Sequence, residues 1–412
     1  MCEKKKKEGY IMYLKSKKFA AMFLACLMLL STATACGKKK EEEKKPSEKT
    51  ETPKNPETPE KKDEKIVFKD MIGREITLAK VAKRVMPNSP ETIRLYCYID
   101  GSQGLLGIPE IEKKIGPAGR PYAFANPDLL NLPVLGGYYH LENYEKILME
   151  KPDVFITTAT KDSAECEKIQ GQINAPVIVL DYGDKVIFEP KMYQSLEIIG
   201  KFTGKEDKAK KLVDYMESIK KDLQDRTKDI PESKKKTAYV GGLIWNGPHG
   251  IEGTRANYPL FDVVNVKNVV TETKEGHIDI DKEQLLKWNP DYIFLDLGSM
   301  HLIQEDYNKN KEYYRSLKAF KNGNVHAQIP FVACHVNVET ALANAYYIGK
   351  VVYPENFQDV DIVKKSNEIF TNIVGKPVYE QLTNNNVSGY QKITLQDLDA
   401  NKFYKPIIKK KN

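Results

Sequence analysis

Histidine side chains supply the clearest chemistry in this chain, which has 6 of them, most of them in its second half. Four come after stretches that read as buried strands, where loops begin: His249, His277, His301 and His335. A neutral imidazole can hydrogen-bond or coordinate a metal ion, so we expect these four to contact a ligand. We single out His249 and His301 as metal-ligand candidates, because glycine-flanked loops leave little core for a side chain to fill. A surface role is an equal alternative for His277 and His335.

Aromatic and cationic side chains stand in similar loops. Tyr138, Tyr139 and His140 follow a pair of glycines, and Trp245 follows a predicted strand. Their rings offer apolar surface with polar edges, which suits a planar or bulky chelate. Arg255 could pair bidentately with a carboxylate of such a ligand, or it could be a surface charge near the following helix. Together these residues predict a ligand-binding site.

Familiar catalytic and nucleotide-binding patterns are absent from the sequence. It has no GxSxG, no HExxH and no Walker loop, and the glycine-rich residues 101–107 lack the phosphate-loop lysine. Cys97, Cys166 and Cys334, the cysteines outside the N-terminal region, show no CxxC spacing, which argues against a zinc site or a disulfide framework. We therefore expect a binding protein without a cofactor, and not an enzyme.

The elements that must position these residues show in an internal repeat. Residues 145–156 recur as residues 283–294 at a constant offset, with Glu, Leu, Pro and Asp at matching positions. Each copy reads as a short helix, a Pro-Asp turn and a buried strand, so the chain is predicted to be α/β with parallel sheets. In such sheets ligands bind on the loops at the carboxyl ends of the strands, where the histidines and aromatic residues are placed.

Between the two copies lies a segment that reads as one long helix. Residues 206–228 contain no Gly or Pro, and apolar residues recur three and four positions apart, from Ala209 to Leu223. We expect this helix to join an N-terminal lobe, residues 64–205, to a C-terminal lobe with a helical tail, residues 229–412. An ordinary surface helix is the alternative.

The N-terminal region reads as an export signal. Lysines precede an apolar run from Phe19 to Leu30, and small residues then lead to Cys36. This predicts a signal peptide over residues 1–35, because the apolar run is shorter than the ~20 residues that span a bilayer. Residues 36–63 are almost wholly Lys, Glu, Pro, Thr and Ser and predict a disordered tether. Met12 is an alternative start to Met1.

Charge does not point to nucleic acid. The formal net charge of +7 lies partly in the N-terminal region. No basic stripe with interleaved aromatic residues supports a nucleic-acid partner.

Taken in order, these features resemble one family, the substrate-binding lipoproteins of ABC importers for iron-siderophores, cobalamin and haem. The motifs are the lipobox-like end at Cys36, with Ala33 where leucine is preferred, "DMIGREITL" followed by "AKRV", the Glu…Pro-Asp repeat, the long helix and "ETALANAYYIGKVVYPENF". The resemblance implies two Rossmann-like lobes with parallel sheets joined by a single long α-helix. It also implies capture of an iron-siderophore or related metal chelate between the lobes, with the loop of Tyr138 and Tyr139 in contact with it.

The resemblance also implies partners and a location. Cys36 would carry a lipid that anchors a monomer to the outer face of the cell membrane, and the chelate would pass to an ABC permease and its ATPase. Acidic residues on the lobe rims dock such proteins on the permease, and Glu110, Glu112 and Glu252 are the residues we assign to that role. The alternatives are a chelatase-like tetrapyrrole or metal enzyme, and a surface haem or metal receptor without a transporter.

Overall fold

The fold is described from a computed structural model, for residues 65–137, 143–271, 276–384 and 389–403. Every described residue belongs to one compact unit, Lys61–Asn412. Cys36, the predicted signal peptide and the whole of the predicted tether lie outside the described residues.

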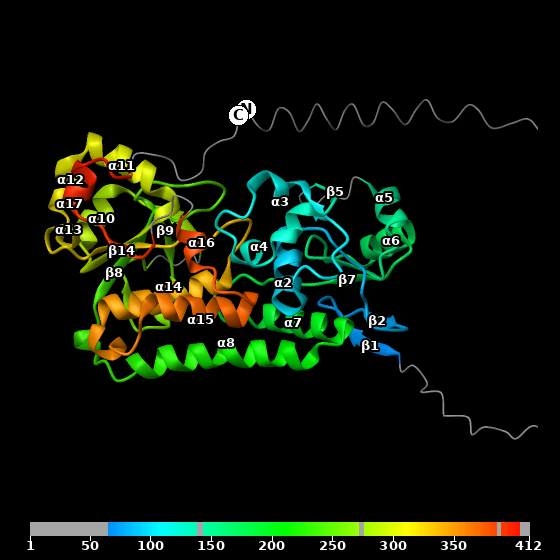
Figure 1. The fold of residues 1–412 in the computed structure, drawn as a ribbon. Helices are drawn as coiled ribbons and strands as arrows, with labels where there is room; N and C mark the ends of the chain where they lie inside the picture. Colours follow the sequence, from blue (N-terminus) through cyan, green and yellow to red (C-terminus); the bar gives the residue numbers. More distant parts are fainter. Residues whose placement is uncertain (1–64, 138–142, 272–275, 385–388, 404–412) are drawn as a thin grey trace, which may run out of the picture. The chain divides into compact units, whose positions relative to one another are not determined.

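The N-terminal lobe begins with the predicted hairpin and continues into a parallel sheet (Figure 1). β1 (Ile66–Lys69) pairs antiparallel with β2 (Glu75–Leu78). β3 (Val85–Pro87), β6 (Val154–Thr157) and β7 (Val177–Val179) then form a sheet in that order, and β4 (Ile108–Pro109) pairs in parallel with β5 (Val134–Gly136). Phe155 packs into a different apolar cluster from its neighbours Val154 and Ile156, so the sheet is buried on both faces.

Helices cover those faces. They are α2 (Pro90–Asp100), α3 (Glu110–Ile115), α4 (Pro121–Ala125), α5 (Tyr144–Met149), α6 (Ser163–Ile173) and α7 (Pro190–Thr203), with a 3₁₀ turn at Pro127–Asn131. Helix α2 begins where the sequence predicts, with Ser89 at the N-cap and Pro90 in the first turn. The Ser89 side chain accepts from the Thr92 amide, and the Thr92 side chain accepts from the Ser89 amide, which satisfies two donors at the helix start.

The C-terminal lobe repeats this plan. Its sheet has the order β10 (Lys267–Asn268), β8 (Thr237–Gly241), β12 (Tyr292–Asp296), β13 (Val325–Gln328) and β14 (Gln391–Lys392), and β14 alone is antiparallel. β9 (Gly253–Ala256) pairs antiparallel with β11 (Gly276–Asp279) beside it. The helices are α9 (Pro259–Asp262), α10 (Lys282–Trp288), α11 (Met300–Lys309), α12 (Lys311–Ser316) and α13 (Lys318–Lys321), with 3₁₀ turns at Glu232–Lys234 and Leu297–Ser299.

The aspartate of the Pro-Asp turn has the same structural role in both copies of the sequence repeat. Asp153 accepts hydrogen bonds from the amides of Lys83 and Arg84, at 2.8 and 2.9 Å, just before β3. Asp291, its counterpart in the second copy, accepts from the amide of Thr237 at 3.0 Å, at the start of β8. The carboxylate therefore joins the start of β6 to the start of β3 in the first lobe, and the start of β12 to the start of β8 in the second. This repeated contact confirms the duplicated lobe.

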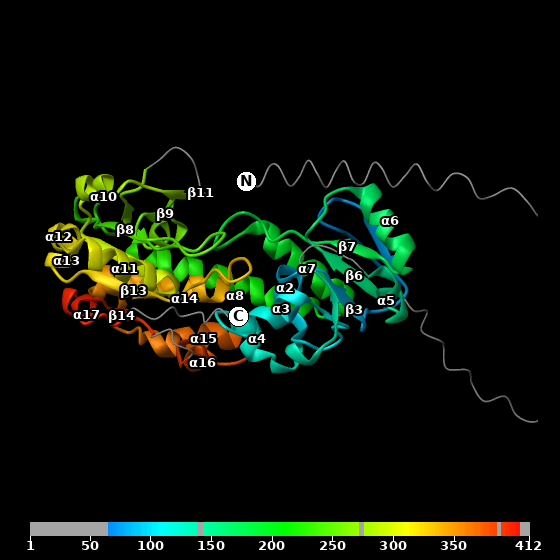
Figure 2. The ribbon, with the colours of Figure 1, turned by 90° about the horizontal axis from the view of Figure 1, so that it is seen from above.

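Helix α8 (Glu206–Thr227) joins the lobes and buries the predicted apolar stripe, namely Ala209, Leu212, Met216, Ile219 and Leu223. It lies against α7 of the first lobe and against α14 (Val338–Val352) and α15 (Ile362–Val374), which follow the second (Figure 2). A single apolar cluster contains side chains from α2, α7, α8 and α14 and from β8. The two lobes thus share part of one core.

The chain after Asp361 returns to both lobes. Helices α15 and α16 (Tyr379–Asn384) contact α4 of the first lobe, whereas β14 extends the sheet of the second and α17 (Leu395–Asp399) packs on α11.

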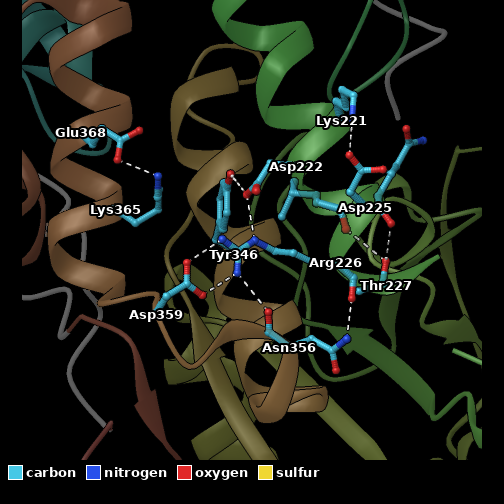
Figure 3. A network of polar contacts seen from close by, with 12 residues as sticks. Lys221, Asp222, Asp225, Arg226, Thr227, Tyr346, Asn356, Asp359, Lys365 and Glu368 are labelled. Carbon is cyan, nitrogen blue, oxygen red and sulfur yellow. Dashed lines mark hydrogen bonds and ion pairs between the residues drawn. The ribbon is translucent and has the colours of Figure 1, made fainter. Parts of the chain in front are cut away.

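Arg226 near the end of α8 ties this returning chain in place. It forms a bidentate pair with Asp359, at 2.7 Å to each oxygen, and also contacts Asp222, and a 3₁₀ turn at Pro354–Phe357 lies beside it (Figure 3).

Candidate functional site

Polar side chains join the carboxyl ends of neighbouring strands in the N-terminal lobe. After β3, the Asn88 amide donates to the Thr157 hydroxyl at 2.7 Å, and the Ser89 hydroxyl lies 3.2 Å from that of Thr158. Asn88 and Ser89 follow β3, Thr157 is the last residue of β6 and Thr158 follows it, so the predicted carboxyl edge of the sheet exists.

The matching edge of the C-terminal lobe is closely packed around Gly298. A Cβ at this glycine would lie 2.4 Å from Cδ1 of Ile244 and 3.3 Å from Cγ of Pro330, so the loops after β8, β12 and β13 meet here. His301 lies in the first turn of α11 and not in a loop as predicted. Its Nδ1 and the hydroxyl of Ser299 are buried and have no hydrogen-bond partner among the described residues.

Trp245 is the centre of an aromatic cluster beside this edge. The rings of His249 and Trp245 stack with centroids 3.5 Å apart, and those of His277 and Trp245 stack at 4.8 Å. His249 is held by Asp279, whose carboxylate lies 3.0 Å from Nδ1, and by the carbonyl of Trp245, 3.0 Å from Nε2. Three ring systems that the sequence separates by up to 32 positions therefore form one half-buried surface.

The β9–β11 pair adds a cation to this cluster. His277 is in a strand and not in the loop that the sequence predicts, and it stands directly opposite Arg255. Opposite residues in an antiparallel pair point to the same face, so the imidazole and the guanidinium share one side. Burial, followed by the neighbouring Arg255 and His249, lowers the pKa of His277 to about 4. His277 is therefore neutral at physiological pH.

His335 lies in a tight loop between β13 and α14. Its ring meets the Tyr182 ring edge-on with centroids 4.5 Å apart, so this part of the C-terminal lobe reaches the loop that follows β7. Cys334 and His335 both have positive φ, +50° and +78°, a conformation that side chains other than glycine rarely adopt.

Asp296 at the end of β12 is a feature that the sequence analysis missed. Its side chain is 1% exposed, and this burial raises its pKa to about 7, although Oδ1 accepts from the Gly298 amide at 2.9 Å. The sequence signal that could have identified Asp296 is its position, as a charged residue directly after the apolar run from Tyr292 to Leu295.

The remaining predicted site residues differ in their outcomes. Tyr138, Tyr139 and His140 lie outside the described residues. Glu112 is fully buried and pairs with Arg120, so it has no surface with which to dock, and its assignment to docking is wrong.

Glu110 is exposed and Glu252 is half-buried, and their docking role stays a prediction. Within the described part of the chain, no three His, Cys, Asp or Glu side chains are arranged to hold a metal ion, and no described helix is long and apolar enough to cross a membrane.

The sequence profile of the family described as "Periplasmic binding protein" matches residues 118–328, just over half of the chain. The chain therefore belongs to the periplasmic binding protein family. It is a substrate-binding protein and not an enzyme, and its resemblance to the substrate-binding proteins of ABC importers is confirmed.

Individual relatives are distant. The chain is 24% identical over 323 residues to the molybdate-binding protein MolA of Haemophilus influenzae, an alignment that covers 74% of this chain and 89% of MolA. It is 21% identical over 349 residues to YvrC of Bacillus subtilis, named as an uncharacterised ABC transporter substrate-binding lipoprotein, which covers 83% and 98% of the two chains. A crystal structure of a periplasmic solute binding protein from Veillonella parvula superposes with a TM-score of 0.62 at 16% identity and covers 84% of this chain and 100% of the other, which shows the same fold.

Proposed function

We propose that this chain is the solute-capturing component of an ABC importer, that a lipid on Cys36 holds it outside the cell membrane, and that its cargo is a metal chelate such as a ferric siderophore. The observation that carries the choice of cargo is the stack of His249 and His277 on Trp245. Ring faces bind the apolar parts of a chelate, and ring nitrogens bind its polar edges.

Charge in the same cluster supports an anionic chelate. Arg255 faces the same side of the β9–β11 pair as His277, and a guanidinium matches a carboxylate or a pair of oxygens bidentately. His277 adds no charge at neutral pH, because its pKa is lowered to about 4. The cluster can therefore bind a large anion through one cation and several rings.

A bare oxyanion is the second candidate. MolA is named for molybdate, and oxyanions are bound by hydrogen-bond donors. The hydroxyl of Ser299 and Nδ1 of His301 are buried at the carboxyl edge of the sheet with no partner among the described residues, so they could serve a small anion. This candidate needs neither Trp245 nor Arg255.

A fluorescence titration separates the two cargoes. The mature chain is titrated in turn with a ferric catecholate complex, haemin, cobalamin and sodium molybdate, and indole emission is followed. We expect a chelate to quench Trp245, because coloured or paramagnetic ligands quench a nearby indole. Binding of molybdate alone would refute the chelate proposal.

Two tryptophan variants provide the controls. Trp245→Phe leaves only Trp288, whose ring is 6.5 Å from that of Tyr239, and should abolish the response. Trp288→Phe should leave the response intact. Alanine at both Tyr139 and His301 should weaken binding by ~1–3 kcal/mol for each of the two side chains that touches the cargo. Full affinity in that double variant would place the site elsewhere.

Docking on the permease is proposed to use carboxylates at repeated positions. Glu145 in α5 and Glu283 in α10 occupy the same place in the two copies of the repeat, and both are exposed. A permease with two similar halves would meet one carboxylate from each lobe, with Glu110 and Glu252 as further contacts. Lysine at both Glu145 and Glu283 should abolish uptake and spare ligand binding, and unchanged uptake would remove these two residues from the interface.

A further inference from the structure

A fully buried arginine of the N-terminal lobe grips the loop of His335. Arg94 in α2 donates from Nη2 to the carbonyls of Ala333 and Cys334, at 2.9 and 3.0 Å, and from Nε to Oδ1 of Asn337 at 3.2 Å. Its guanidinium also lies over the rings of Tyr122 and Tyr182, 5.0 and 5.7 Å from their centroids. The loop thus belongs to the C-terminal lobe in sequence, but it is hydrogen-bonded to the N-terminal lobe.

Other contacts hold the same loop from the same side. Tyr182 donates to the carbonyl of Val336 at 2.7 Å, and Nδ2 of Asn337 donates to the carbonyl of Gly119 at 3.1 Å. Tyr98 donates to the buried carboxylate of Glu339, in the first turn of α14. Residues 333–337 are therefore fixed to the N-terminal lobe by several independent hydrogen bonds.

The loop that Arg94 binds has a strained backbone, and contacts from outside the loop are needed to stabilise that conformation. Cys334 and His335 are two consecutive residues with positive φ, a conformation that residues other than glycine adopt only at a cost in free energy. Inside the loop, the Ala333 amide bonds to the carbonyl of His335 at 3.0 Å, and the Asn337 amide bonds to that of Phe331 at 2.7 Å. The Arg94 guanidinium adds bonds to two further carbonyls of the turn, those of Ala333 and Cys334.

We propose that Arg94 is a positioning residue of the binding cleft, which holds the strained turn at Cys334 and His335 and so presents the His335 imidazole to the cargo. The presentation to cargo rests on the proposed function, whereas the hold on the turn does not. His335 is half-buried, and its Nδ1 has no partner among the described residues.

The arrangement also decides the charge of His335. Burial first, and then the positive charge of Arg94, lower the pKa of His335 to about 4, against the weaker opposing effects of Glu91 on α2 and Asp184 after β7. A neutral imidazole can donate and accept at once, which a protonated one cannot. Arg94 thus holds the ring in place and adds to the effect of burial that keeps it neutral.

Histidine titration by NMR tests the hold. In the full mature chain, Arg94→Met should raise the midpoint of His335 titration toward 6.5, because the cation and the burial are both lost. His326 is the internal control, since its pKa is lowered to about 4 by burial and by Lys392, with Arg94 not among the causes. Arg94→Lys should give an intermediate midpoint. The His335 signal is assigned with His335→Gln.

Hydrogen exchange and probe binding complete the test. The amides of Ala333 and Asn337 should exchange roughly tenfold faster in Arg94→Met. Tyr182→Phe, which removes the bond to Val336 and leaves the Arg94 guanidinium in place, gives a milder variant if Arg94→Met does not fold. Binding of the ferric catecholate complex and of sodium molybdate should weaken at least about fivefold in either variant for the probe that the wild type binds.

Two patterns would overturn the proposal. In the first, His335 titrates at the same pH and the turn exchanges at the same rate in wild type and variants. In the second, the turn loosens but a probe binds with unchanged affinity. Failure of the proposed function looks different, because then neither probe binds the wild type while the His335 midpoint still shifts in Arg94→Met.

Discussion

Replacing Asp296 by asparagine should make the protein's stability less sensitive to a rise in pH toward 7. The carboxyl group is 1% exposed at the end of β12, and its burial raises the pKa from 3.8 to about 7. Because the folded pKa is above the unfolded one, the folded state holds this proton more tightly. Its contribution to stability is complete below pH 3.8 and is lost as the pH rises to about 7.

The magnitude follows from that shift. A shift of about three units corresponds to roughly 4 kcal/mol in all, at ~1.4 kcal/mol for each unit. Between pH 5.5 and 8.5 the wild type should lose roughly 2 kcal/mol through this group alone. Asparagine keeps an oxygen that can accept from the Gly298 amide and cannot ionise, so Asp296→Asn should lack that loss.

Urea denaturation at pH 5.5, 7 and 8.5 measures the effect. The difference in unfolding free energy between Asp296→Asn and wild type should grow with pH by roughly 2 kcal/mol. Asp162→Asn is the matched control, because Asp162 also accepts from an amide two residues ahead but is exposed. A difference that stays constant with pH would refute the reasoning, since it would mean that water reaches the Asp296 carboxyl.

Further predictions concern the joining helix and the N-terminus. Met216→Asp places a charge at a position that is 1% exposed and should cost several kcal/mol, whereas Lys211→Asp on the exposed face should cost less than about 0.5 kcal/mol, by thermal unfolding. Equal melting temperatures would show that the stripe does not support the core. Arg226→Met removes the bidentate pair with the exposed Asp359 at the end of α8 and should lower the unfolding free energy in urea by about 1 kcal/mol, and a wild-type midpoint would assign that pair no net energy. Cys36→Ser should release the chain from membranes or leave it unprocessed, and membrane fractionation at unchanged mobility would disprove the lipid anchor.

Local patterns predicted the elements well where one residue's neighbours decide its conformation. The three-and-four spacing from Ala209 to Leu223 predicted α8, and Ser89 with Pro90 predicted the start of α2. These predictions succeeded because helix periodicity and capping depend on residues a few positions apart. The prediction that His277 lies in a loop failed because residues 276–279 form a short strand that pairs with β9. The residues of that strand do not by themselves indicate the pairing.

The sequence by itself determined the α/β class, the duplicated lobe and the joining helix. The repeat could be read because each Pro-Asp turn performs the same local task, with Asp153 and Asp291 bonding the start of the neighbouring strand. An aspartate at such a turn makes its hydrogen bonds to the neighbouring strand alone. The same residue therefore appears at the same position in both copies, and the repeat can be recognised in the sequence.

Only the tertiary structure decided which side chains meet and which ionise. Arg94 bonds to a carbonyl 239 positions away, and Glu112 is buried against Arg120 although its acidic neighbour Glu110 is exposed. The pKa of Asp296 likewise depends on every element that excludes water from it. Burial and long-range contacts arise from the packing of whole lobes, and no spacing within a short segment encodes that packing.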